Sequence, residues 1–135
     1  MSKHFYLTRQ EHFSASHRLY VDSLTKSEND TLFGKCVRVH GHNYVFEVTL
    51  TGKTDPKTGM IINLHDFKLI LKDQIVDRFD HYHLNDLAEF SDISTTVENV
   101  AMVIWQLLKK TPIASLLYEV KIIETPRNIA IYRED

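Results

Sequence analysis

The chain has 135 residues, of which 43% are hydrophobic and 25% are charged, so it can bury one ordinary core and we expect one domain, residues 1–135. Its formal net charge of -2 leaves no basic field of the kind that neutralises a phosphate backbone, which excludes nucleic acid as an expected partner. The N-terminal stretch MSKHFYLTRQ lacks the apolar core of a signal peptide, and the longest apolar run, AMVIWQLL, is too short to span a bilayer, so we expect no membrane association.

The first part of the chain predicts two long β-strands separated by a polar loop. Residues 5–17 are aromatic-rich and compatible with a strand, and residues 44–51 (YVFEVTLT) are rich in β-branched residues with an alternating pattern. Residues 21–35 are polar and turn-prone, which predicts a surface loop that can carry a short helix.

The second part of the chain predicts two helices and two further strands. Asn63 can cap a helix with apolar residues at helical spacing, namely Leu64, Phe67, Leu71, Ile75 and Phe79. Thr95 and Glu98 form a predicted capping box in front of the second helix, VAMVIWQLLKK. The runs LYEVKIIET and NIAIYRE flank residues 126–128, which predicts two strands joined by a tight turn.

Three histidines have the spacing of a metal site. His40 and His42 lie two residues apart in VHGHNY, so on a strand their imidazoles point to the same face. His17 ends the first predicted strand and lies across from this pair if the two strands are antiparallel. A catalytic zinc ion often takes three protein ligands and keeps one position for water or substrate. The spacing leaves two interpretations open: zinc ligands, or structural rings hydrogen-bonded to the backbone.

Cys36 is a candidate nucleophile or general base. It lies four residues before His40, next to Lys35 and near Arg38, and nearby cations favour the thiolate form that either role requires. Two other roles stay open, a small core residue and a fourth zinc ligand. As the single cysteine it cannot form an intrachain disulfide, which favours a reducing compartment and predicts a cytoplasmic location.

Two acidic residues follow predicted elements at positions suited to a site. Asp80, with its neighbour His81, follows the first predicted helix and can orient an imidazole for proton relay, although a structural role is the alternative. Glu124 closes the third predicted strand, where an ionised carboxylate can face a pocket and accept hydrogen bonds from a guanidine-like group.

Six short motifs occur in one order over nearly the whole chain: FSASHRL, C-x-x-x-HGHNY, D-P-x-T-G-M, DHYHLN, T-x-E-N-V-A and E-T-x-x-N-x-x-x-Y. In combination they resemble the family of 6-pyruvoyltetrahydropterin and 6-carboxytetrahydropterin synthases. The resemblance implies an α+β tunnel fold of order ββααββ, an antiparallel sheet with two helices on one face. It also implies trimers whose sheets form a barrel, stacked in pairs as a homohexamer with active sites at the subunit interfaces.

The resemblance also implies a zinc-dependent lyase that acts on a small molecule, 7,8-dihydroneopterin triphosphate. By matched position, His17, His40 and His42 bind Zn²⁺, and Cys36 is the catalytic base.

Other matched positions concern proton relay and substrate binding. Asp80 and His81 relay protons from a neighbouring subunit, Glu124 anchors the pterin ring, and the backbone of Thr96 contacts it. Arg18 and Lys35 are candidate partners of the triphosphate, because Arg binds phosphate in bidentate fashion and Lys binds it as a point charge. Solvated surface charge is the alternative for both.

The product that the resemblance implies depends on which segment is weighed. Three residues separate Cys36 from His40, as in the 6-carboxy enzymes, whereas LFGKC and ENVAMVIW are similar to the animal 6-pyruvoyl enzymes. Weighing the spacer, we expect 6-carboxytetrahydropterin and acetaldehyde, as in queuosine and deazapurine synthesis. The alternative is 6-pyruvoyltetrahydropterin. Two further alternatives are a module that binds zinc or pterin without turnover and a structural zinc protein.

Overall fold

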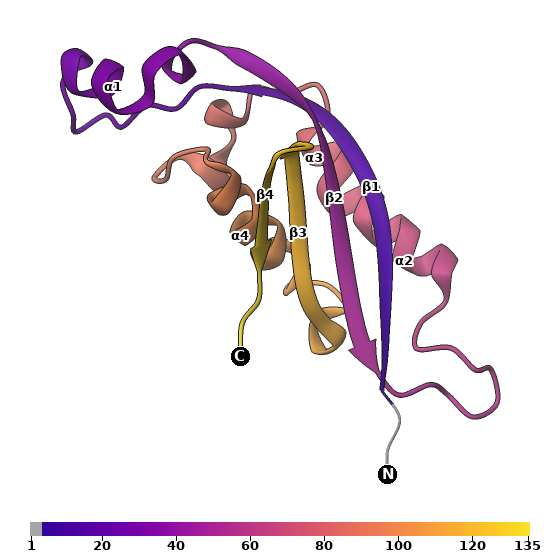
Figure 1. Cartoon of the computed structure of the whole chain (residues 1–135). Coiled ribbons are helices and arrows are strands. Elements are labelled where there is room, and N and C mark those ends of the chain that lie inside the picture. The colour runs from indigo at the N-terminus through magenta and orange to yellow at the C-terminus, as the bar shows by residue number, and fades with distance from the viewer. Residues whose placement is uncertain (1–3) are drawn as a thin grey trace.

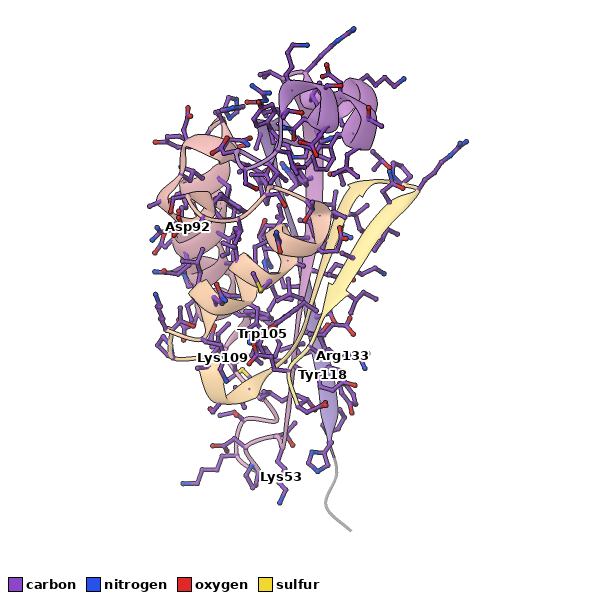
Figure 2. All side chains as sticks on the ribbon, turned by 90° about the vertical axis from the view of Figure 1, so that its left-hand side faces the viewer. Lys53, Asp92, Trp105, Lys109, Tyr118 and Arg133 are labelled. Carbon is purple, nitrogen blue, oxygen red and sulfur yellow. The ribbon has the colours of Figure 1, made fainter. Side chains whose placement is uncertain are left out.

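The computed structural model describes residues 4–135, so residues 1–3 of the expected domain lie outside the description. It contains one four-stranded antiparallel sheet of order β1-β2-β3-β4. The strands are β1 (Phe5–His17), β2 (His40–Gly52), β3 (Leu117–Thr125) and β4 (Asn128–Tyr132). Figures 1 and 2 show the main helices on one face of this sheet, which confirms the predicted α+β arrangement.

The helices follow the predicted order, with additional short turns. The α-helices are α1 (Lys26–Phe33), α2 (Leu64–Leu71), α3 (Asp77–Phe79) and α4 (Val97–Leu108). A π-helical segment, η2 (Lys72–Val76), joins α2 to α3, and short 3-10 helices occupy η1 (Gly34–Val37), η3 (Leu84–Asp86), η4 (Ala88–Phe90) and η5 (Ala114–Leu116). Within residues 4–135, none of the helices has the length and apolar character needed to cross a membrane.

The β1–β2 pair is longer than the sequence predicted. Each strand has 13 residues, and the pairing runs without interruption from Phe5 opposite Gly52 to His17 opposite His40. The added part of β2 contains Gly41, where a Cβ atom would lie 3.3 Å from the carbonyl oxygen of Ala15. A residue without a side chain therefore lets the two strands stay close where they carry the histidines.

One predicted helix start is confirmed and the other is wrong. The side chain of Asn63 caps α2 by accepting hydrogen bonds from the backbone of His65 (2.8 Å) and Asp66 (3.4 Å). The capping box of Thr95 and Glu98 does not form, because the Thr95 hydroxyl donates to the carbonyl of Arg18 instead (3.0 Å). Thr96 is the cap of α4 and accepts from the backbone N–H of Asn99 (3.3 Å).

An aromatic cluster anchors the helices to the sheet. The ring of Phe13 lies 5.0 Å from Tyr44, 5.4 Å from Phe79 and 5.8 Å from Phe46, measured between centroids, and all four side chains are fully buried. Aromatic pairs at these separations add to the stabilisation from buried area. Because Phe79 comes from α3, this cluster fixes the loop that follows α3 beside the end of β1.

Removing the Phe79 ring leaves a cavity between the helices and the sheet. We expect Phe79→Ala to lower the free energy of unfolding by about 3–5 kcal/mol, measured by urea denaturation. Leu69 lies on the same helical run but is 40% exposed, so Leu69→Ala is the matched control and should cost less than about 1 kcal/mol. Equal losses for the two variants would contradict the position of the core.

Candidate metal centre

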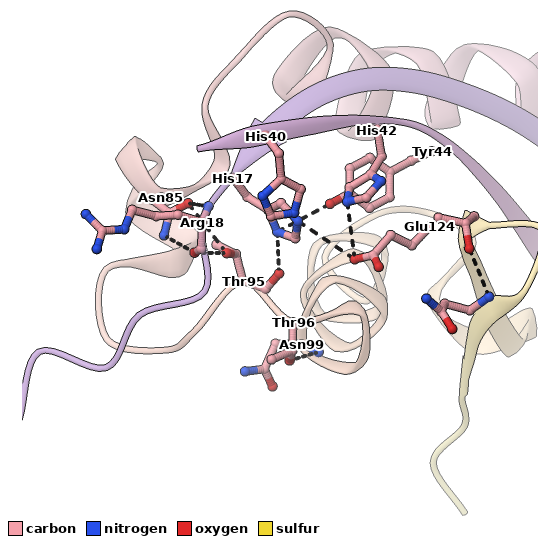
Figure 3. Close-up of polar contacts among 12 residues, drawn as sticks. His17, Arg18, His40, His42, Tyr44, Asn85, Thr95, Thr96, Asn99 and Glu124 are labelled. Atoms are coloured by element: carbon pink, nitrogen blue, oxygen red, sulfur yellow. Dashed lines mark hydrogen bonds and ion pairs between the residues drawn. The ribbon is translucent and has the colours of Figure 1, made fainter. Parts of the chain in front are cut away.

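Three histidines converge where the β1–β2 pair ends (Figure 3). His17 is the last residue of β1 and pairs with His40, the first residue of β2, while His42 follows on the same face. One ring nitrogen of each lies within 4.8 Å of the others, and the ring centroids are 4.6 to 5.1 Å apart. The predicted antiparallel pairing is therefore confirmed, and it brings all three imidazoles together.

Backbone carbonyls hold two of the rings with Nε2 turned toward the group. The Nδ1–H of His17 donates to the Thr95 carbonyl (2.8 Å), and that of His40 donates to the Arg38 carbonyl (2.7 Å). The Nε2 atoms of His17 and His42 are buried and have no hydrogen-bond partner. Leaving buried polar atoms without a partner is costly, and a bound metal ion satisfies them. The donor set thus fits a metal ion, and purely structural rings would leave these atoms unexplained.

The environment keeps the His17 ring neutral, which is the form that binds a metal. Burial is the main cause that lowers the pKa of His17 to about 4; the hydrogen bond to the Thr95 carbonyl partly opposes it, and the nearby rings of His40 and His42 contribute a smaller lowering. Burial also lowers the pKa of His42, and the charge of Glu124 opposes this shift.

Glu124 lies beside the histidines at the end of β3. Its Oε2 atom is 3.8 Å from Nε2 of His17 and 3.9 Å from Nε2 of His42. Glu124 and Thr96 line the same cavity of about 380 Å³, together with Leu19 and Asn128. The structure therefore brings the two predicted pterin-binding residues to one pocket next to the histidine group.

Cys36 lies outside the histidine group. It belongs to η1 and is half-buried, and its carbonyl accepts a hydrogen bond from the backbone N–H of Leu19 (2.8 Å). Among residues 4–135, the one group of metal-binding side chains at ligand spacing consists of the three histidines. The arrangement therefore gives no support to a closed zinc shell with the cysteine as fourth ligand.

Asp80 and His81 form a pair at the outer edge of β1. Asp80 accepts from the backbone N–H of Ser14 (2.8 Å) and lies 2.9 Å from Nδ1 of His81, and the Ser14 hydrogen bond lowers the pKa of Asp80. The backbone N–H of His81 donates to the Ser14 carbonyl (2.6 Å), with His81 at a φ of 66°. The pair forms no hydrogen bond or ion pair with the three histidines in the described chain, although His81 and His42 border one open cavity of about 560 Å³.

Arg18 and Lys35, the predicted triphosphate partners, have different surroundings. Figure 3 shows Arg18 and Glu124 on opposite sides of the histidine rings. The Arg18 guanidinium stacks 4.2 Å from the centroid of the Tyr20 ring, its Nε atom is buried without a partner, and it lines a cavity of about 800 Å³. Lys35 is exposed on η1.

The fold and the site together define an α+β protein with a candidate three-histidine metal centre. Residues 6–135 match the family described as "6-pyruvoyl tetrahydropterin synthase". The chain is 46% identical to the 6-pyruvoyl tetrahydrobiopterin synthase of Dictyostelium discoideum over 134 residues, 98% of each chain. It is 45% identical to the Homo sapiens protein of that name, covering 94% of this chain and 90% of that one. The solved structure of Caenorhabditis elegans 6-pyruvoyl tetrahydropterin synthase has a TM-score of 0.94 at 38% identity, covering 99% of this chain and 98% of that one.

The chain is an enzyme of the 6-pyruvoyl tetrahydropterin synthase family. The product favoured from the sequence, 6-carboxytetrahydropterin, and with it the role in queuosine synthesis, is wrong, because these full-length relatives are named for the 6-pyruvoyl product. The short spacer after Cys36 misled the prediction for a physical reason. Cys36 lies in a 3-10 turn that is tied to Leu19, so the number of residues before His40 does not by itself set where the thiol lies.

The buried, neutral His17 should make the metal-free protein sensitive to acid. Its pKa is about 4 in the folded chain against the ordinary histidine value of 6.5, so the unfolded chain binds more protons between these values and stability falls as the pH drops through them. After chelation of metal, we expect the wild type to lose roughly 2 kcal/mol more than His17→Gln across this range, allowing for solvent screening. Urea unfolding at several pH values measures the difference, and parallel curves would contradict it.

Proposed function

We propose that the enzyme is a zinc-dependent lyase that converts 7,8-dihydroneopterin triphosphate to 6-pyruvoyltetrahydropterin and triphosphate. The observation that carries the proposal is the convergence of His17, His40 and His42, with buried and unpartnered Nε2 atoms, beside the Glu124 carboxylate. The names of the full-length relatives support this product.

The three histidines would hold zinc through nitrogen, a ligand set that suits this ion and leaves a coordination position for substrate. Bound zinc supplies Lewis-acid polarisation of the side-chain hydroxyls of the substrate, which acidifies the adjacent C–H bonds. The carbonyls of Thr95 and Arg38 keep the rings of His17 and His40 in the required tautomer.

Glu124 and Thr96 would bind the pterin ring in their shared cavity. The Glu124 carboxylate can accept two hydrogen bonds from the guanidine-like edge of the pterin, which orients the ring and directs its side chain toward the histidines. Thr96, the cap of α4, lines the same cavity, and its backbone can complete the contact.

Cys36 and the pair of Asp80 and His81 would move the protons. The Cys36 thiolate removes a carbon-bound proton from the substrate side chain, and His81, oriented by Asp80, donates a proton back. The carbon–oxygen bond to the triphosphate breaks, and its electron pair leaves with the triphosphate oxygen. Hydrogen moves from the side chain to the pterin ring, so substrate and products balance without an external oxidant.

A second copy of the chain would complete the site. Asp80 and His81 lie at the outer edge of β1, on the far side of this strand from β2, and form no hydrogen bond with the histidine group. At the opposite edge of the sheet, the strand β4 exposes the side chains of Ile129 (46%) and Ile131 (56%). We therefore propose a homohexamer, a dimer of trimers whose sheets close into a barrel, with the relay pair drawn from the neighbouring subunit.

A thiol-based mechanism fits a reducing compartment, and we therefore propose that the enzyme works in the cytoplasm.

Arg18 and Lys35 would attract the triphosphate. Arg18 lies across the histidine rings from Glu124, as a substrate with its pterin and its triphosphate at opposite ends requires. Arg18 directly follows the proposed ligand His17, and Lys35 directly precedes Cys36, so both supply positive charge near the proposed site. Arg18 can also bind phosphate in bidentate fashion.

Incubation of the zinc-loaded enzyme with 7,8-dihydroneopterin triphosphate, without a reductase, tests the proposed reaction. We expect mass spectrometry to find 6-pyruvoyltetrahydropterin, with triphosphate released and no acetaldehyde. Chelation should abolish turnover and added zinc should restore it. His42→Ala should lose zinc and turnover, whereas His65→Ala, an exposed histidine of α2, should lose neither. Zinc binding without turnover would overturn the proposed reaction in favour of a binding module.

Cys36→Ala tests the assignment of the base. We expect kcat to fall by about 10²–10⁴-fold, the usual contribution of a general base, while zinc content stays at the wild-type level. Val39→Ala, which shortens a side chain that is 64% exposed in the same segment, is the matched control. Unchanged turnover in Cys36→Ala would show that another group takes the proton, and loss of zinc would show that the thiol is a ligand.

A further inference from the structure

We propose that Asn85 is a positioning residue of the metal centre, which acts with Thr95 to fix the ring of His17 for metal binding. The inference rests on the proposed function, because it requires that His17 binds zinc. A chain of hydrogen bonds leads from Asn85 through the end of β1 and Thr95 to the imidazole.

The first link joins Asn85 to the backbone of Arg18. The Arg18 N–H donates to Oδ1 of Asn85 (2.9 Å), and Nδ2 of Asn85 donates to the Arg18 carbonyl (3.0 Å). Arg18 is the first residue beyond β1, where the pairing with β2 has ended. Because a backbone N–H only donates and a carbonyl only accepts, the two bonds fix the orientation of the amide. Asn85 thus holds the chain just after the ligand.

The second link joins Arg18 to Thr95. The Thr95 hydroxyl donates to the same Arg18 carbonyl (3.0 Å) and lies 3.5 Å from Oδ1 of Asn85. Thr95 is fully buried, and its own carbonyl accepts the Nδ1–H of His17 (2.8 Å). Figure 3 shows Thr95 between Asn85 and the histidine rings. Displacement of Asn85 would therefore move the carbonyl that orients the His17 ring.

His17 depends on this network more than the other two histidines do. The carbonyl partner of His40 belongs to Arg38, two residues away, and its position is set locally. The partner of His17 lies 78 residues further along the chain. With Nδ1–H bound to Thr95, the free lone pair of His17 is on Nε2, which faces His42 and Glu124. Loss of such outer partners typically weakens metal affinity by about 10–100-fold.

The test compares two asparagines that bind backbone in the same way. Asn29 also clamps the backbone, accepting from the Val21 N–H (2.8 Å) and donating to the carbonyls of Val21 (3.1 Å) and Thr25 (3.0 Å), but it has no bond to the metal ligands or their partners. Zinc affinity is measured by competition with a chromogenic chelator, without substrate. We expect Asn85→Leu to bind zinc about 10–100-fold more weakly than wild type, and Asn29→Leu to stay within about twofold of wild type.

A second pair of variants keeps the proposal testable if Asn85→Leu does not fold. Thr95→Val removes the hydroxyl while keeping the shape and the carbonyl, and should weaken zinc binding about tenfold, whereas Thr95→Ser should restore it. Wild-type affinity in Thr95→Val, or equal losses in Asn29→Leu and Asn85→Leu, would overturn the role of the network. A wild type that binds zinc but does not turn over the pterin would overturn the proposed function and leave this comparison intact.

Discussion

The pairing of β1 with β2 is the interaction on which the rest of the structure depends. Its register places His17 opposite His40 and sets His42 on the same face. A shift of one residue would turn His17 to the other face of the sheet, since side chains alternate along a strand. The same register places Phe13 opposite Tyr44 in the aromatic cluster, so burial of these rings and assembly of the histidine group favour one alignment.

The metal centre imposes a cost that the core must offset. Buried Nε2 atoms of His17 and His42 lack partners, and burial holds the first of these rings neutral. In the absence of a ligand, each such atom lowers the free energy of unfolding. Metal binding and stability are therefore coupled, because an ion that binds only the folded chain recovers this loss. The fully buried aromatic cluster nearby supplies a large apolar contribution of opposite sign.

Local patterns in the sequence predicted most of the elements and the convergence of the three histidines. Strand alternation, the cap at Asn63 and the His-x-His spacing are all properties of short segments, so a single sequence is enough to find them. The helix cap at Thr95 was wrong because two neighbouring threonines offer equivalent caps, and the choice depends on Arg18, 77 residues earlier. Asn85 carries no local signal beyond its place in DHYHLN, since its partners are backbone atoms 67 residues away. The product was wrong because residue spacing does not describe a folded turn.

The segment after α3 bears on how another chain could pair with the edge of this sheet. Residues 81–83 cover part of the outer edge of β1, through bonds from His81 N–H to the Ser14 carbonyl and from Ser16 N–H to the Tyr82 carbonyl. Exposed edges invite unwanted pairing with other chains, so this cover acts as a stop. A strand from another copy that approached this edge would find the Ser14 carbonyl and the Ser16 N–H already bonded. If two copies paired through this edge, the stop would limit how far one strand could slide along the other and would so fix their stagger.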